Sequence, residues 1–344
     1  MTEPRSIFCV GTVLILTLLP GRVLYAGAPA VPEEYESTGG QSLAFGGSVA
    51  TGLGGASAIR ANPALMALEK EYSINGAYHW PTAGRDFYQV GVVDGKTSPI
   101  AAGFTYTGAQ DNYQGLASNA RSPDPAAKGP DVVGLSKDSP VIRRAGLALA
   151  IPLGKVYLGA GGSFVEARPP TEALMEDSNA TIKGFTMGFG LAGHLTEALR
   201  IGFSAENLAN KKVQYAAPTF YRAGASYFMG SIASIHLDYR RREAVAIYEG
   251  RAASFTLEGD GGAKANALSE ENFLNASASI KIYDLLRVIV ATGQARSAEQ
   301  SATRLAGGLA LVNQSFNFTY QALKPDLATD SVHHALSLGL NIML

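Results

Sequence analysis

The chain has 344 residues, a formal net charge of −1 and 17% charged residues, against roughly 25% in ordinary soluble domains. Its 39 glycines are about one and a half times the usual share. The near-zero net charge, with Arg240–Arg242 as the largest local basic run, excludes nucleic acid as a general partner.

The N-terminal residues predict an export signal, which we place at residues 1–28. Arg5 precedes the run 7–19, which is apolar apart from two threonines and is too short to cross a bilayer as a helix. Small residues follow, so cleavage is expected between residues 26 and 30; an uncleaved anchor is the alternative. Cleavage removes Cys9, the single cysteine, and leaves neither a disulfide nor a thiolate site.

Beyond residue 70 the sequence shows a period-two alternation of apolar and polar residues. In 336–344, for example, Leu or Ile occupies every second position. Alternating segments of about ten residues are typical of strands that cross a bilayer as part of a closed barrel. We expect fourteen such strands, near 72–80, 86–94, 100–109, 140–151, 155–166, 182–192, 199–207, 219–228, 231–240, 273–282, 286–294, 303–312, 315–323 and 332–343.

The connections between these segments alternate in length. Every second connection is short, as at 229–230 and 313–314, whereas the others include the long polar stretches 110–139 and 241–272. Short turns on one rim and long loops on the other are typical of outer-membrane barrels. We therefore predict an all-β protein, a transmembrane antiparallel β-barrel over residues 71–344, surrounded by membrane lipid in the outer membrane of a Gram-negative bacterium. The two long loops are the expected contact surfaces for any protein partner.

A fourteen-stranded barrel has a lumen wider than eight-stranded barrels and narrower than porins, so we expect a plug. Residues 29–70 are predicted to supply it as an N-terminal hatch inside the lumen, with glycines that let its backbone pack closely against the wall. Residues 56–68 are expected to form a short helix interrupted by Pro63. Asn62 is expected to cap a helix, with proline at the first helical position.

The residues of the predicted hatch that we select as ligand or gating candidates are Phe45, Asn62, Pro63, Ala64, Leu65 and Met66. The alternative for the Asn-Pro-Ala turn is a purely structural role.

Two motifs resemble a known family. Residues 58–65 (AIRANPAL) follow a Gly-rich run and precede the first strand, and they resemble the N-terminal hatch of the FadL/TodX outer-membrane transport proteins and of the related PorV-type barrels. Residues 199–204, 206–208 and 221–224 resemble strands seven and eight of that superfamily. The resemblance implies a fourteen-stranded barrel and, in the transporter branch, passage of hydrophobic molecules. The chain is short for a FadL protein and has a smaller hatch.

Charged residues are expected on the inward faces of the strands, at Arg200, Glu206, Arg222, His236, Asp238, Arg240, Lys281, Arg287 and Arg304. Buried charges in a narrow lumen must be paired, so the favoured interpretation is a network that anchors the hatch. A site for a ligand carboxylate is the alternative, with Arg222 and Lys281 as its cations. The charged lumen residues selected as site candidates are Arg222, His236, Asp238, Lys281 and Arg287.

The sequence predicts no catalytic residue, no metal site and no cofactor. Residues 188–193 match a GxGxxG pattern, but apolar side chains alternate through it as in a strand, whereas a dinucleotide site needs a strand–helix junction. The five histidines lack metal-site spacing on a helix, and His333 and His334 are expected on opposite faces of a strand. A GxSxG nucleophile motif is absent from the sequence.

Three functions remain open. The preferred hypothesis is a passive channel for small hydrophobic compounds, such as long-chain fatty acids or hydrocarbons. The alternative is a non-transporting PorV-type barrel that acts as a protein secretion or assembly partner, and an enzyme or a purely structural barrel is the third. A lumen without an apolar cavity beside residues 45–68 would argue most strongly against the first.

Overall fold

A computed structural model describes the strands, most of the short turns and an inner helical segment. The described residues are 45, 50–51, 54–81, 85–111, 141–167, 182–210, 213–214, 217–243, 270–283, 285–297, 301–313, 315–324, 327 and 332–342. The predicted signal at residues 1–28 lies outside them, as do residues 29–44 of the predicted hatch. The helices and strands are α1 Ala56–Ala61, α2 Leu65–Glu69, β1 Tyr72–Pro81, β2 Arg85–Asp94, β3 Ala101–Asp111, β4 Val141–Leu153, β5 Val156–Ala167, β6 Ile182–His194, β7 Leu199–Leu208, β8 Phe220–Met229, β9 Ala233–Arg242, β10 Glu271–Ile282, β11 Leu286–Ser297, β12 Ser301–Val312, β13 Phe316–Lys324 and β14 His333–Asn341.

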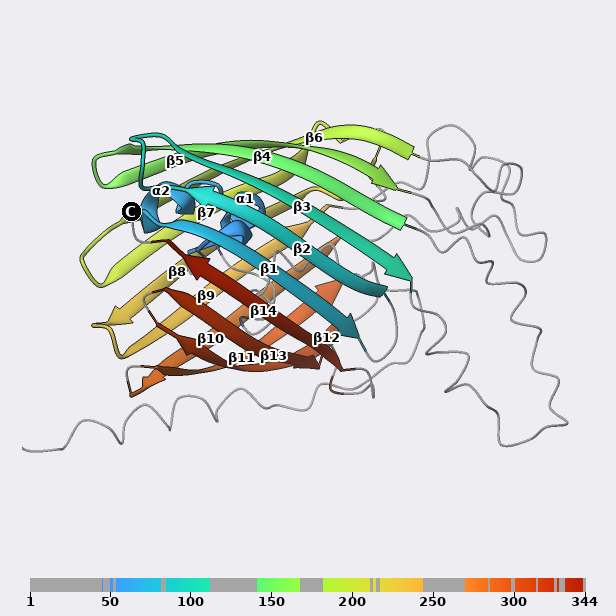
Figure 1. The fold of residues 1–344 in the computed structure, drawn as a ribbon. Coiled ribbons are helices and arrows are strands. Elements are labelled where there is room, and N and C mark those ends of the chain that lie inside the picture. The colour runs from blue at the N-terminus through green and yellow to red at the C-terminus, as the bar shows by residue number, and fades with distance from the viewer. Residues whose placement is uncertain are drawn as a thin grey trace, which may run out of the picture.

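The strands form one closed antiparallel barrel (Figure 1). Each strand pairs with its neighbours along the chain, and β1 pairs with β14 to complete the ring. The fourteen predicted strands are confirmed, with ends that differ from the prediction by at most three residues. Closure pairs the backbone groups of every strand on both sides, which is the condition for crossing hydrocarbon as a sheet.

The two faces of the wall differ in chemistry as the alternation predicts. Along β9, Ile235, Leu237 and Tyr239 are exposed on the outside. His236 and Asp238 lie between them and are buried on the inside. Outward apolar side chains suit contact with lipid, and inward polar side chains must find partners within the lumen.

The short turns follow β2, β4, β6, β8, β10 and β12, and all lie at one rim because the strands are antiparallel. We call this the short-turn rim. The connections 112–140, 168–181 and 244–269 leave from the opposite rim and lie outside the described residues, apart from their ends. The two loops predicted to bind protein partners therefore fall largely outside the described structure.

An aromatic cluster on the outer face lies near the rim opposite the short turns. The ring of His334 stacks between those of Trp80 and Tyr320, with centroid distances of 5.8 and 6.1 Å. His333 instead faces inward, with its ring centroid 5.3 Å from that of His79. The prediction that the two histidines point to opposite faces is confirmed. Outward aromatic residues near a rim are typical of the bilayer–water boundary of membrane barrels.

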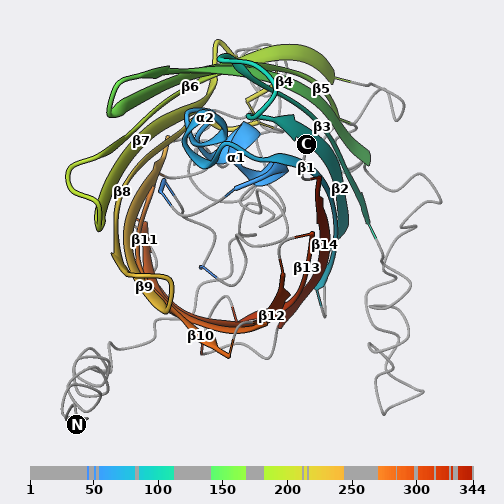
Figure 2. The same cartoon turned by 60° about the vertical axis from the view of Figure 1, so that its left-hand side comes forward.

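Two short helices lie inside the ring of strands, against the inner face of β1 to β7 (Figure 2). We call residues 54–69, which contain α1 and α2, the inner segment. Pro63 separates the helices because it lacks the N–H that a continuous helix would use. Neither helix, nor any other within the described residues, has the length and hydropathy to cross a membrane.

Candidate functional site

The Asn62–Ala64 turn is the point where the inner segment is held to the wall. The Asn62 side-chain nitrogen Nδ2 donates hydrogen bonds to the carbonyl oxygens of Ala50 and of Leu191 in β6, at 2.9 and 3.0 Å. Its Oδ1 accepts from the backbone N–H of Ala64 at 3.2 Å. Asn62 ends α1 and Ala64 precedes α2, so the Asn-Pro-Ala stretch forms a turn between the two helices and not the first turn of one.

Two glycines on the wall make room for this turn. Gly159 in β5 and Gly190 in β6 are direct cross-strand partners. A Cβ atom on Gly190 would overlap with Asn62 Oδ1, and one on Gly159 would overlap with the backbone nitrogen of Ala64. Only glycine lets the two backbones approach this closely. The GxGxxG pattern at 188–193 therefore lies within a strand, where Gly190 makes room for the turn.

The apolar side chains of the inner segment pack against small residues of the wall. Leu65 and Met66 are fully buried, at 0% and 1% exposure, and each such burial stabilises by about 1.5–3 kcal/mol. Together with Ile59 they form a cluster with inward-facing wall residues of β2, β3, β4 and β6, which are Val93, Ala101, Ala148, Ala150 and Ala192. The small inward side chains of these strands thus leave room for the inner segment.

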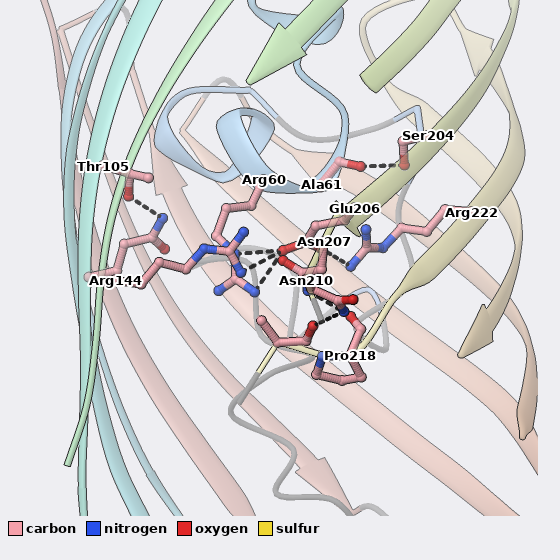
Figure 3. A network of polar contacts seen from close by, with 12 residues as sticks. Arg60, Ala61, Thr105, Arg144, Ser204, Glu206, Asn207, Asn210, Pro218 and Arg222 are labelled. Atoms are coloured by element: carbon pink, nitrogen blue, oxygen red, sulfur yellow. Dashed lines mark hydrogen bonds and ion pairs between the residues drawn. The ribbon is translucent and has the colours of Figure 1, made fainter. Parts of the chain in front are cut away.

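A buried carboxylate ties the inner segment to two strands (Figure 3). Glu206 in β7 accepts ion pairs from Arg60 at 2.9 Å, Arg144 at 3.1 Å and Arg222 at 2.7 Å. All four side chains are less than one-tenth exposed. Beside them Ser204 Oγ donates to the carbonyl oxygen of Ala61 at 2.5 Å. One carboxylate therefore joins α1, β4, β7 and β8.

A second carboxylate, 13% exposed, repeats the arrangement in the neighbouring strands, where Arg240 is the cross-strand partner of Arg222. Glu271 in β10 lies 2.9 Å from Arg242, 3.5 Å from Arg304 and 3.7 Å from Arg240. The guanidinium groups of Arg240 and Arg304 lie over the ring of Phe273, at 4.8 and 4.7 Å from its centroid. Cation–π contacts of this kind are stronger when they are desolvated.

A cavity of about 750 Å³ lies at the short-turn rim, between β8 and β12. Its apolar lining includes Phe45, Phe228 and Leu286, and its polar lining includes Lys281 and Arg287. The two cations are direct cross-strand partners on the inner face of β10 and β11. The two side chains place two positive charges side by side on the inner wall of the cavity.

His236 forms part of the cavity wall in a fixed orientation. Its Nδ1 lies 2.6 Å from Ser226 Oγ, and its Nε2 lies 2.8 Å from Ser234 Oγ. Its ring meets that of Phe45 edge to face, with centroids 5.0 Å apart. The described residues hold no group of three His, Cys, Asp or Glu side chains able to bind a metal ion.

Solved structures match this fold, whereas no family model and no curated protein matches the sequence. The toluene transporter TbuX of Ralstonia pickettii is 13% identical, with a TM-score of 0.60 over 90% of this chain and 99% of that chain. The toluene transporter TodX of Pseudomonas putida is 10% identical, with a TM-score of 0.59 over 88% and 98%. A FadL homologue of Pseudomonas aeruginosa is 12% identical, with a TM-score of 0.51 over 83% and 93%. The chain has the fold of the FadL/TodX-like barrels.

In this FadL/TodX-like barrel the predicted site residues fall into three groups. Phe45, His236, Lys281 and Arg287 come together at the cavity. The run from Asn62 to Met66 lies against β2 to β6. The remaining two, Arg222 and Asp238, serve as anchors: Arg222 pairs with Glu206, and Asp238 Oδ1 accepts from the backbone N–H of Ala50 at 2.8 Å. Arg222 and Lys281 are thus not one carboxylate site.

Sequence reasoning missed Arg60, Arg144, Glu271 and the glycine pair Gly159 and Gly190. One signal for the place of the inner segment was available, because inward positions near the short-turn ends of β3 to β6 include Gly103, Ala148, Gly159 and Gly190. Small inward side chains on neighbouring strands indicate that another part of the chain fills the space. No comparable signal pairs Arg60 with Glu206, which is 146 residues away.

Proposed function

We propose that this FadL/TodX-like barrel is an outer-membrane channel for passive uptake of small compounds with a large apolar part. The observation that carries the proposal is the cavity of about 750 Å³ beside Phe45, lined by both apolar side chains and cations. Fold similarity to proteins described as toluene transporters and as a FadL homologue supports it. In this proposal the protein binds and passes its ligand without chemical change.

The inner segment acts as the hatch in this proposal. It lies against β1 to β7, and in this proposal a ligand passes between it and the part of the wall that carries Lys281 and Arg287. Lys281 and Arg287 favour ligands that carry a carboxylate, such as fatty acids, over neutral hydrocarbons, because guanidinium and ammonium groups bind carboxylates by charge-assisted hydrogen bonds.

The replacement of both cations, Lys281→Gln with Arg287→Gln, tests the ligand class. We expect binding of decanoate to weaken about tenfold or more, because each lost charge-assisted hydrogen bond is a sizeable fraction of the affinity. Binding of toluene should change little, because the apolar lining is intact. Isothermal titration calorimetry of the purified barrel with each ligand measures both.

The matched control is Arg241→Gln, which removes a cation on the outer face, 2.8 Å from Glu270. It should leave the binding of both ligands unchanged. Equal losses for decanoate and toluene in the lumen variant would contradict the assignment of the cations. A wild-type protein that binds neither ligand would contradict the proposed function itself.

Epitope tags test the orientation in the outer membrane. A tag inserted within 120–125 or 255–262 should react with antibody on intact cells, because these connections leave the rim that outer-membrane barrels expose outside. A tag in the turn at Gly230–Ser231, between β8 and β9, should react only after permeabilisation. Surface labelling at Gly230–Ser231 would reverse the proposed orientation.

A further inference from the structure

The outer face of the barrel carries an apolar groove over β4, β5 and β6, which continues over β3 and β2. Its volume is about 750 Å³. Ala160 in β5 forms part of its floor, and the ring of Phe185 covers the neighbouring Gly162. Leu147 and Leu149 in β4 line it beside Phe104 of β3. The side over β6 is formed by large side chains, which are Phe185, Met187 and Phe189. All of these large side chains are exposed.

A row of charges crosses the same three strands at the end of the groove away from the short turns. Arg143 in β4 is the cross-strand partner of Glu166 in β5, which is the partner of Lys183 in β6. Lys183 Nζ lies 3.2 Å from Glu166, and the two side chains are 55% and 32% exposed. Two cations thus flank one carboxylate, which leaves the row with a net positive charge.

The groove lies where the acyl chain of a lipid would lie, and the row of charges lies where its phosphate would lie. The groove lies on the face that a bilayer covers with acyl chains, and a recess lets one chain pack on three sides instead of one. The row lies within three residues of the strand ends, at Val141, Ala167 and Ile182, which is where phosphate groups of a bilayer meet a barrel. Arginine and lysine are the side chains that bind phosphate most strongly.

We propose that the outer face of β4–β6 is a binding site for a phosphorylated lipid of the leaflet at the long-connection rim. One acyl chain lies in the groove over Ala160, beside the ring of Phe185, and a phosphate binds Arg143 and Lys183 on the lipid side of Glu166. In the orientation proposed above, this lipid is the phosphorylated glycolipid of the outer leaflet. The site is on the opposite face of the wall from the lumen, so it is independent of what the channel passes.

Native mass spectrometry of the full-length barrel in detergent tests this proposal. The probes are bisphosphorylated lipid A, a galactosyl diacylglycerol without phosphate, and inorganic phosphate. We expect retained lipid A adducts on the wild type and at least tenfold fewer with the other two probes. The Arg143→Gln, Lys183→Gln double variant should lower the apparent affinity for lipid A about tenfold, since charge-assisted hydrogen bonds are lost. Ala160→Phe, which fills the groove, should lower it without any change of charge.

Arg241→Gln is the matched control, because Arg241 also faces outward near a strand end and pairs with a half-exposed glutamate. It should retain lipid A like the wild type. The proposal is overturned if the double variant binds as well as the wild type, or if Arg241→Gln loses as much. It is also overturned if inorganic phosphate or the neutral lipid binds as tightly as lipid A. A heat-dependent shift in gel mobility confirms that each variant is folded before it is measured.

Discussion

Deletion of the inner segment, residues 54–69, is expected to leave a barrel that inserts normally and conducts ions far better than the parent. The strands begin only at Tyr72, and closure depends on their pairing rather than on what fills the lumen. A fourteen-stranded lumen without its filling approaches an aqueous channel, so single-channel conductance should rise by about an order of magnitude. Planar bilayer recordings measure it.

A single substitution that displaces the inner segment without removing it tests the same role. Gly190→Leu places a side chain where Asn62 Oδ1 lies, so it should displace the turn and raise conductance partway toward the deletion. Gly76→Leu is the matched control, because Gly76 is a strand glycine where an added Cβ meets nothing closer than 4.0 Å. A deletion variant that inserts normally yet conducts no more than the parent would contradict the hatch role.

The second large effect is expected at Glu206, which forms ion pairs with three buried arginines. Glu206→Gln keeps the shape of the side chain but leaves Arg60, Arg144 and Arg222 without their shared carboxylate. Loss of one partner from a buried ion pair typically costs about 3–5 kcal/mol, because the remaining charge stays desolvated. We expect the free energy of unfolding, measured by urea titration in lipid vesicles, to fall by about this amount.

Protease sensitivity distinguishes release of the inner segment from loss of stability of the barrel itself. Arg60 lies on α1 and is buried at 6% exposure, so release of the inner segment should expose the bond after Arg60 to trypsin while the barrel stays intact. Glu166→Gln is the control, because its ion pair with Lys183 is partly exposed and such pairs contribute at most about 1 kcal/mol. Equal effects of Glu206→Gln and Glu166→Gln would show that the buried cluster does not hold the segment.

The sequence by itself determined the strands and their two faces. The alternation of Ile235, His236, Leu237 and Asp238 assigns each residue to lipid or lumen, because side chains of a strand point to opposite sides with a period of two. This pattern is local, so it is complete within ten residues of chain. The number of strands and the unequal lengths of the connections follow when the same alternation is traced along the whole chain.

Only the tertiary structure decided which inward residues meet. Glu206 joins Arg60 across 146 residues, and Lys281 faces Arg287 because β10 and β11 pair in that register. Asn62 shows the same division: its bond to the N–H of Ala64 is local, whereas its bond to the carbonyl of Leu191 joins it to a strand 129 residues away. Barrel closure brings such partners together in space. A pattern within ten residues of chain carries no information about which residue more than a hundred positions away will be the partner.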